Sequence, residues 1–254
     1  MIYSPILDNN ARERVETVIG IPTYNESESL PKLIKQIAPL LKPSDLILIL
    51  DDSDNDEFQR TILVVESEFT YSLGKLLFNN VEVKSGRGTA IRRGMSFSYK
   101  NFPNMMYFIE CDGDGSHQPT DILSIKDYGL NCDLLIGSRY LPKSKILGWP
   151  ITRRIFSYLL NKIIPFVFNL PITDVTNGLR RYSKKAVNAI LHENPENSGF
   201  IYLTEQALIV KKNGLEFKEL PINFVNRIIG NSSVSLRDVL LALKGLLQLL
   251  LHKI

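Results

Sequence analysis

Short apolar runs alternate with amphipathic segments through residues 17–136, and this order leaves few fold classes open. The runs that predict strands lie at 17–21, 46–50, 78–83, 105–111 and 133–136. The segments with apolar residues at helical spacing lie at 30–41, 57–68, 86–100 and from 120 onward. Strands separated by helices pair in parallel, with helices on both faces. The sequence therefore predicts an α/β fold with a single Rossmann-like, mostly parallel sheet.

Composition indicates an ordinary globular protein whose cysteines are reduced thiols. The chain has 254 residues, of which 44% are hydrophobic and 22% charged. A net charge of +3 is too small to favour a nucleic-acid partner. Cys111 and Cys132 lie in or beside predicted core strands without metal-ligand spacing, which predicts buried thiols in a reducing compartment.

Two observations bear on export and membrane insertion. Residues 1–16 carry charges and Asn where a signal peptide has an apolar run, so we expect no export. No uncharged stretch reaches the length that crosses a bilayer.

The acidic turn Asp112-Gly113-Asp114 follows the apolar run 105–111. Two carboxylates one residue apart repel each other unless a cation shares them. Mg²⁺ or Mn²⁺ typically takes two carboxylates and completes its shell with water and substrate phosphates. A solvated acidic turn is the alternative, and for an isolated Asp-x-Asp it is the more frequent case.

The acidic turn is accompanied by polar clusters at the ends of two other predicted strands, at 22–26 and 51–54. Ligands of open α/β sheets bind at the carboxyl ends of the strands. Three clusters at such ends favour a functional site over a solvated turn.

Several motifs occur in a characteristic order. The first half contains PTYNE at 22–26, DDSD at 51–54, GRGTAIRRG at 86–94, DGDGSHQP at 112–119 and GSRY at 137–140. The second half contains WPITRR at 149–154, DVTNGLR at 174–180, SGF at 198–200, ELPI at 219–222 and NR at 226–227. The ordered set resembles family 2 glycosyltransferases of the GT-A fold, and more narrowly the dolichol-phosphate mannose synthase group of polyprenyl-phosphate glycosyltransferases. The resemblance covers roughly residues 15–240, and we expect a GT-A domain at 1–235 followed by a C-terminal amphipathic helix at 236–254.

The resemblance implies a site for a nucleotide diphosphate sugar. Asp112 and Asp114 are expected to bind Mg²⁺ or Mn²⁺ with Ser116 in the next ligand position, and Asp114 is expected to be catalytic through the metal. The remaining residues expected to bind the nucleotide sugar are Pro22, Tyr24, Glu26, Asp51, Asp52, Gly86 and Arg87, with Asp112 shared.

The resemblance also implies a polyprenyl phosphate acceptor. Arginine binds phosphate through bidentate hydrogen bonds. The expected acceptor-phosphate residues are Arg139, Arg153, Arg154, Arg180 and Arg227, and Arg139 is also expected to be catalytic. The alternatives are a structural ion pair for Arg139 and a solvated helix start for Arg153 and Arg154. His117 is expected to support the turn instead of acting as a base.

Two positions depart from the family pattern. Ser233 stands where relatives usually have a Lys near the phosphates of the donor. The lack of this Lys bears on the affinity for the donor phosphates or on the identity of the donor. Arg87 stands where many have Lys, and it keeps the charge.

Two apolar stretches, 158–170 and 236–251, are broken by charged or polar residues. Each is suited to lie in a membrane surface, and packing against the domain or a partner is the alternative. We therefore expect a peripheral enzyme at the cytoplasmic face of a membrane, with a membrane-anchoring partner or a homodimer as further options.

The leading hypothesis is transfer of a hexose, with mannose or glucose favoured, from a nucleotide sugar to polyprenyl phosphate with inversion. One alternative is a soluble GT-A enzyme that acts on a saccharide hydroxyl and needs a carboxylate base, with Asp174 and Glu205 as candidates. Another is an inactive nucleotide-sugar-binding module. A nucleotidyltransferase would need a Gly-rich basic loop, which residues 19–25 lack.

Overall fold

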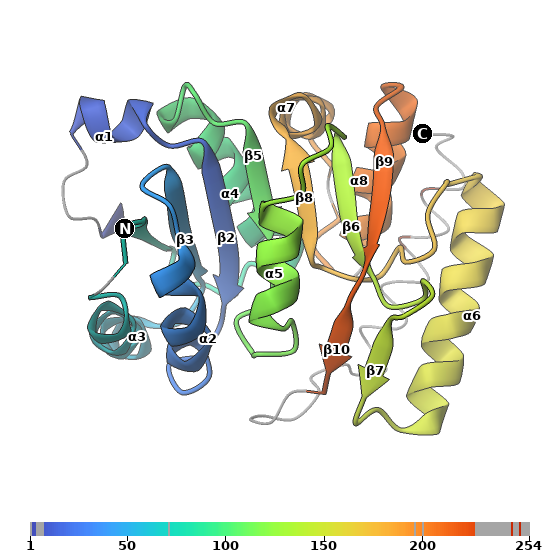
Figure 1. The fold of residues 1–254 in the computed structure, drawn as a ribbon, viewed down its shortest axis with the longest axis horizontal. Coiled ribbons are helices and arrows are strands. Elements are labelled where there is room, and N and C mark those ends of the chain that lie inside the picture. Colours follow the sequence, from blue (N-terminus) through green and yellow to red (C-terminus); the bar gives the residue numbers. More distant parts are fainter. Residues whose placement is uncertain are drawn as a thin grey trace.

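An eight-stranded sheet forms the centre of the protein, in the strand order β1-β4-β3-β2-β5-β8-β6-β9 (Figure 1). The computed structural model describes residues 2–3, 8–70, 72–195, 197–199, 201–226, 245 and 249. Only β1 and β8 run antiparallel to their neighbours in this sheet. Its strands are β1 (Ile2–Tyr3), β2 (Thr17–Thr23), β3 (Asp45–Asp51), β4 (Lys75–Asn80), β5 (Tyr107–Glu110), β6 (Leu134–Ser138), β8 (Arg180–Ser183) and β9 (Phe217–Pro221).

Helices cover both faces of the sheet, as the alternating pattern predicts (Figure 1). The side chains of β3 show why its sequence is uniformly apolar: Leu46 and Leu48 join the core cluster on one face, and Ile47 joins the cluster on the other. One face is covered by α2 (Leu30–Ile37), α3 (Asn55–Glu68) and α5 (Pro119–Lys126), and the other by α4 (Arg87–Asn101), α7 (Lys184–Glu193) and α8 (Tyr202–Lys212). A short helix, α1 (Asn9–Glu13), precedes β2.

The predicted strands are present, and one of them is displaced. The strand expected at 78–83 is β4, which begins at Lys75 and ends at Asn80. Glu82 has a left-handed backbone with φ of 56°, which ends the extended pairing, and Val83 beyond it is exposed. The short strand β8 was not predicted.

A smaller sheet and a long helix extend the site at one end of the molecule. Strands β7 (Lys145–Leu147) and β10 (Asn223–Val225) pair in parallel, and α6 (Ile151–Phe168) lies at the outer edge beside them (Figure 1). The amide of Val225 donates to the carbonyl oxygen of Ser116 at 3.1 Å. This hydrogen bond joins the small sheet to the acidic turn.

The expected C-terminal helix at 236–254 lies outside the described residues except for Gly245 and Leu249. Leu249 is buried in the core cluster that includes α7 and α8. Both thiols, Cys111 and Cys132, are free and buried, as predicted. Within the described ranges, no helix is both long enough and apolar enough to cross a bilayer.

Candidate active site at the carboxyl edge of the sheet

The three predicted clusters meet at the carboxyl ends of the parallel strands. The amide of Asn25, after β2, donates to Ser53 Oγ, after β3, at 2.8 Å. Gly113 packs so closely on Glu26 that a Cβ there would lie 2.7 Å from Glu26 Oε2. The structure therefore brings the loops after β2, β3 and β5 into one site.

The acidic turn is shaped by its own backbone and by His117. Asp114 Oδ1 accepts a hydrogen bond from the Ser116 amide at 2.9 Å. His117 Nδ1 accepts from the Asp112 amide at 3.0 Å, so Nε2 carries the proton and donates to Asn177 Oδ1 at 3.0 Å. Burial lowers the pKa of His117 to about 4, which keeps the ring neutral near pH 7. His117 thus supports the turn, as expected.

Arg87 connects the acidic turn to a buried carboxylate. Its guanidinium forms ion pairs with Asp112 and with the fully buried Glu110, at 3.0 Å from Nη2 to Glu110 Oε1. Tyr202, at the start of α8, donates to Glu110 and accepts from Arg87 Nε at 2.7 Å. A Cβ on Gly178 would lie 2.9 Å from Arg87 Cζ, so only glycine leaves room for this guanidinium.

The donor set of the acidic turn fits a divalent cation of the Mg²⁺ or Mn²⁺ type. Asp112 and Asp114 supply two hard carboxylate oxygens on one turn, which suits an ion that completes its shell with water and substrate phosphates. Over the residues that the structure describes, no group of three or more His, Cys, Asp or Glu side chains is arranged to hold a metal ion. Ser116 is nearly fully buried beside this turn.

Asp52 and Tyr24, which were expected to contact the nucleoside, lie on the loops after β3 and β2. Asp52 Oδ2 accepts from the amide and the hydroxyl of Ser85 at 2.8 and 2.6 Å, and Oδ1 pairs with Arg93 at 2.9 Å. Tyr24 is exposed, and Lys84 Nζ lies 4.4 Å from the centre of its ring. Pro22 and Glu26 lie beside them and are half-buried.

Asp51 is not accessible to a ligand in the structure, contrary to the sequence-based expectation. Its side chain is fully buried and accepts hydrogen bonds from Thr23 Oγ1 at 2.6 Å, the Ser53 amide at 2.8 Å and Asn80 Nδ2 at 3.1 Å. Because these groups use both carboxylate oxygens, Asp51 holds the loop in shape instead of contacting a base.

Gly86 is the N-cap residue of α4. Its φ of 87° lies in the region that favours glycine. The next glycine, Gly88, donates its amide hydrogen to the carbonyl oxygen of Ser198 at 3.0 Å. Ser198 of the SGF motif is thereby held against the first turn of α4, which carries Arg87.

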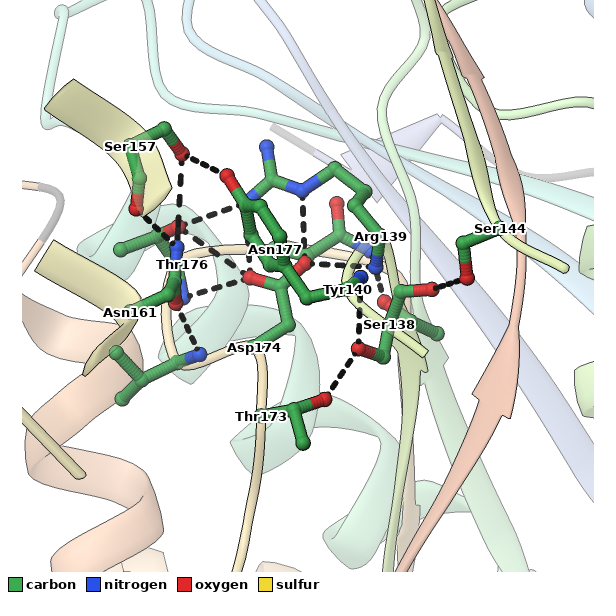
Figure 2. A network of polar contacts seen from close by, with 12 residues as sticks. Ser138, Arg139, Tyr140, Ser144, Ser157, Asn161, Thr173, Asp174, Thr176 and Asn177 are labelled. Atoms are coloured by element: carbon green, nitrogen blue, oxygen red, sulfur yellow. Dashed lines mark hydrogen bonds and ion pairs between the residues drawn. The ribbon is translucent and has the colours of Figure 1, made fainter. Parts of the chain in front are cut away.

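Arg139 lies at the end of β6 and forms a bidentate ion pair with Asp174 (Figure 2). Nε lies 2.7 Å from Asp174 Oδ2, Nη2 lies 2.8 Å from Oδ1, and Nη2 also donates to Thr176 Oγ1 at 2.7 Å. Burial would raise the pKa of Asp174, but the ion pair and hydrogen bonds with Arg139 outweigh it and leave the pKa below its ordinary value. Among the described residues, none forms a hydrogen bond or an ion pair with Arg139 Nη1.

A pocket of about 420 Å³ opens beside Arg139. Arg154 lines it too and donates to the carbonyl oxygen of Ile146. The other lining residues are mostly apolar or aromatic: Tyr140, Ser144, Ile146, Ile155, Tyr158 and Leu159. The pocket therefore combines cationic side chains with an apolar wall.

Arg153 and Trp149 form a second cluster near the pocket. The Arg153 guanidinium lies 4.0 Å from the centre of the Trp149 ring, and its Nη1 donates to Asn226 Oδ1 at 3.2 Å. Trp149 and Phe224 pack edge to face, and Arg139 lies 5.2 Å from the Trp149 ring. The structure thus brings Arg139, Arg153 and Arg154 close together.

Arg180 is not exposed to a ligand, which does not support the sequence-based expectation that it contacts the acceptor phosphate. It is fully buried, and its guanidinium donates to the carbonyl oxygens of Asn177, Leu203 and Val175 at 2.7 to 2.9 Å. Arg180 therefore joins loops behind the site. Arg227 and Ser233 lie outside the described residues.

Neither candidate for a catalytic base is presented to solvent. Asp174 is fully buried in its ion pair with Arg139. Glu205 is also buried, and its Oε2 accepts from the Asn197 amide at 3.1 Å.

Sequence reasoning missed Glu110 and Asn161 as parts of the site. Glu110 is two residues before Asp112, but an acidic residue at the end of an apolar run carries no specific signal. Asn161 interrupts an apolar stretch, which is a signal that a buried polar contact exists but not where its partner lies.

Comparison with known proteins places these features in a family. Residues 18–191 match the sequence model described as glycosyl transferase family 2. An undecaprenyl-phosphate mannosyltransferase of Micrococcus luteus is 30% identical over 87% of this chain and 88% of its own. A polyprenol monophosphomannose synthase of Mycolicibacterium smegmatis is 28% identical over 88% of this chain and 83% of its own.

Solved structures support the fold. Glucosyl-3-phosphoglycerate synthase from Mycobacterium tuberculosis, in complex with Mn²⁺, UDP and glucosyl-3-phosphoglycerate, has a TM-score of 0.63. It is 16% identical, and the match covers 96% of this chain and 81% of that one. The expected α/β architecture of the GT-A type is thereby confirmed.

Proposed function

The chain belongs to glycosyl transferase family 2, and on that basis we propose that it transfers a hexose from a nucleotide diphosphate sugar to a polyprenyl phosphate. The names of the two bacterial relatives support this acceptor class and make mannose the first sugar to test. The observation that carries the proposal is the pocket beside Arg139, where two arginines adjoin the apolar side chains of Ile146, Ile155 and Leu159. A polyprenyl phosphate has a matching structure: its anionic phosphate suits the arginines, and its hydrocarbon chain suits the apolar side chains.

The donor is proposed to bind at the loops after β2, β3 and β5. Tyr24 and Asp52 would contact the nucleoside, while Pro22, Glu26, Gly86 and Arg87 would line the donor site. Asp112 and Asp114 would hold a divalent cation, Mg²⁺ or Mn²⁺, with Ser116 beside them. When bound, this ion stabilises the negative charge that develops on the leaving nucleoside diphosphate.

The acceptor is proposed to lie with its phosphate at Arg139, and with Arg153 and Arg154 nearby. Its attacking oxygen is already ionised near neutral pH, so it needs charge compensation and orientation more than a base. Arg139 supplies both, because Asp174 and Thr176 fix the plane of its guanidinium and leave Nη1 for the phosphate. Direct attack on the anomeric carbon from the side opposite the leaving group gives inversion.

The burial of Asp174 and Glu205 favours the lipid phosphate over a saccharide hydroxyl. A hydroxyl acceptor usually needs a general base within hydrogen-bond reach. Such a base contributes roughly two to four orders of magnitude in rate. Both candidate carboxylates are instead held by protein groups.

We propose that α6 rests on a membrane surface. Its exposed apolar side chains are Ile151, Ile155, Phe156, Tyr158, Leu159, Ile163, Phe166 and Val167. Amphipathic helices bind a membrane surface through such a face, with basic residues near the headgroups. Residues of the same helix line the pocket, so the hydrocarbon chain of an acceptor bound there would remain in the membrane. The cytoplasmic face stays a prediction from the sequence.

The test is a panel of nucleotide sugars, each incubated with a short polyprenyl phosphate or with free saccharides and Mg²⁺ or Mn²⁺. We expect a glycosylated lipid phosphate from one nucleotide sugar, with a mannose donor tested first. Products formed only on saccharide hydroxyls would favour the alternative acceptor. Binding of a nucleotide sugar without transfer to any acceptor would favour the inactive binding module.

A further inference from the structure

Helix α6 has an unusual distribution of polar and apolar side chains. Its buried residues are Asn161, Ile164 and Pro165, whereas many of its large apolar residues are exposed. Asn161 is 3% exposed, and a buried amide is costly unless it is hydrogen-bonded. The contacts of Asn161 therefore hold this helix at a defined position.

Asn161 is fully hydrogen-bonded to the loop that follows α6 and to its own helix (Figure 2). Its Oδ1 accepts from the amide of Val175 at 2.7 Å. Since a backbone amide only donates, this contact fixes which side of the amide is oxygen. Nδ2 then donates to the Ser157 carbonyl oxygen at 2.9 Å and to Thr176 Oγ1 at 2.8 Å.

The Thr176 hydroxyl connects Asn161 to Arg139, because it forms hydrogen bonds with both side chains. A hydroxyl has one hydrogen to donate and two lone pairs to accept with. Asn161 Nδ2 and Arg139 Nη2 occupy the accepting positions at 2.8 and 2.7 Å. The hydroxyl hydrogen is left for Asp174 Oδ1 at 3.3 Å, the same oxygen that binds Arg139 Nη2.

A second contact joins α6 to the residue after Arg139. Tyr140 Oη donates to Ser157 Oγ at 2.7 Å, and Ser157 lies one turn before Asn161 on the same helix face. Helix α6 also forms one wall of the pocket, through Arg154, Ile155, Tyr158 and Leu159. The position of α6 is thus linked to both the pocket wall and the arginine at its end.

We propose that Asn161 is a positioning residue for the acceptor: through Thr176 it fixes the guanidinium of Arg139 so that Nη1 faces the acceptor phosphate. The inference rests on the proposed function. Asn161 itself does not touch the substrate. It acts through Arg139, and its removal affects the acceptor while leaving the donor site intact.

The experiment measures the affinity for geranyl phosphate by calorimetry, and the acceptor KM with a short polyprenyl phosphate. In Asn161→Leu we expect both to weaken about 3- to 10-fold, with unchanged affinity for the nucleoside diphosphate. Thr61→Val is the matched control, since it removes a buried side-chain hydrogen bond to the backbone of α3, at 3.0 Å from Glu57 O. It should leave the acceptor affinity unchanged.

A second pair of variants tests the same step if Asn161→Leu does not fold. Thr176→Val removes the hydroxyl that links Asn161 to Arg139, whereas Thr176→Ser keeps it. We expect the acceptor affinity to weaken in the first and to be retained in the second.

A double-mutant cycle separates positioning from a general effect on the fold. In an Arg139→Lys background the guanidinium is gone, so Asn161→Leu should have little further effect on the acceptor affinity. Additive losses, or an equal loss of nucleoside diphosphate affinity, would overturn the inference while the wild-type protein still transfers sugar to the lipid phosphate. A wild-type protein that neither binds geranyl phosphate nor glycosylates a polyprenyl phosphate would overturn the proposed function and this inference with it.

Discussion

Arg139 and Arg180 are both almost fully buried, but their partners give them different roles. The Arg180 guanidinium donates to three backbone carbonyl oxygens, so it joins loops. Arg139 pairs with Asp174 and lines a pocket. The motifs alone led us to expect both near a phosphate, because a motif does not show whether an arginine is buried or which groups it contacts.

At the acidic turn, we expect Asp114→Asn to abolish transfer without unfolding the protein. The substitution removes one of two carboxylates proposed to hold the divalent ion, and the side chain is only half-buried. Activity with and without a chelator, together with the melting temperature, checks this prediction. Full activity in excess chelator would exclude the metal role.

Glu205→Gln should keep measurable transfer to polyprenyl phosphate. The carboxylate is buried and accepts a backbone hydrogen bond, which a glutamine oxygen can also accept. A folded variant that binds the donor, is inactive with the lipid and is rescued by a small external anion would instead reveal a catalytic base.

Asp174→Asn should lower the free energy of unfolding by about 3–5 kcal/mol near pH 7, because it leaves the Arg139 charge buried without its counter-ion. The pKa of Asp174 is lowered in the folded protein, so the wild-type carboxylate contributes its stability above its ordinary pKa of about 3.9. That contribution is lost as the pH falls through the lower folded value. Urea unfolding of both proteins from pH 8 to pH 4 should therefore show a constant difference between their free energies of unfolding down to about pH 5. A difference that vanishes at pH 6 would contradict the ion pair.

Helix α6 shows what the sequence predicts at the scale of an element. The apolar stretch at 158–170 was considered suited to a membrane surface, with packing against the domain as the alternative. Its side chains divide between the two: Tyr158, Leu159, Ile163, Phe166 and Val167 are exposed, whereas Ile164 and Leu170 are buried. The helix starts earlier, at Ile151, and so includes Arg153 and Arg154 in its first turn. Its link to Arg139 was not predictable, since Asn161 and Thr176 are joined by a contact that has no local pattern.

The apolar face of α6 predicts binding to phospholipid vesicles. Phe166 is 86% exposed, and burying a phenylalanine side chain contributes roughly 1.5–3 kcal/mol, so Phe166→Ser should weaken vesicle binding about tenfold or more. Leu63→Ser on α3 is the control, because Leu63 is 70% exposed but lies on a different helix. Co-sedimentation with vesicles measures both.

Equal losses from the two variants would show that α6 has no special part in vesicle binding. If the wild-type protein is a dimer that Phe166→Ser dissociates, a second copy covers this face instead of lipid.

At the scale of the whole molecule, the sequence predicted the mostly parallel sheet and the edge at which the site lies. Continuous apolar strands and intervening helices determine this layout, because both faces of the sheet must be buried. Strand β8 escaped prediction because two consecutive arginines, Arg180 and Arg181, interrupt the apolar pattern by which the other strands were predicted. Each is buried through hydrogen bonds to backbone carbonyl oxygens. The contact between the small β7–β10 sheet and the acidic turn likewise joins residues more than a hundred positions apart.

The central claim is that the sugar is transferred to a phosphate oxygen of a lipid. Phosphorus NMR of a reaction containing a short polyprenyl phosphate, the preferred nucleotide sugar and Mg²⁺ or Mn²⁺ tests it directly. We expect the phosphate monoester signal to be replaced by a phosphodiester signal as nucleoside diphosphate accumulates, and Arg139→Ala to slow this change much more than it weakens donor binding. A monoester signal that persists while the sugar appears on a hydroxyl group would contradict the account.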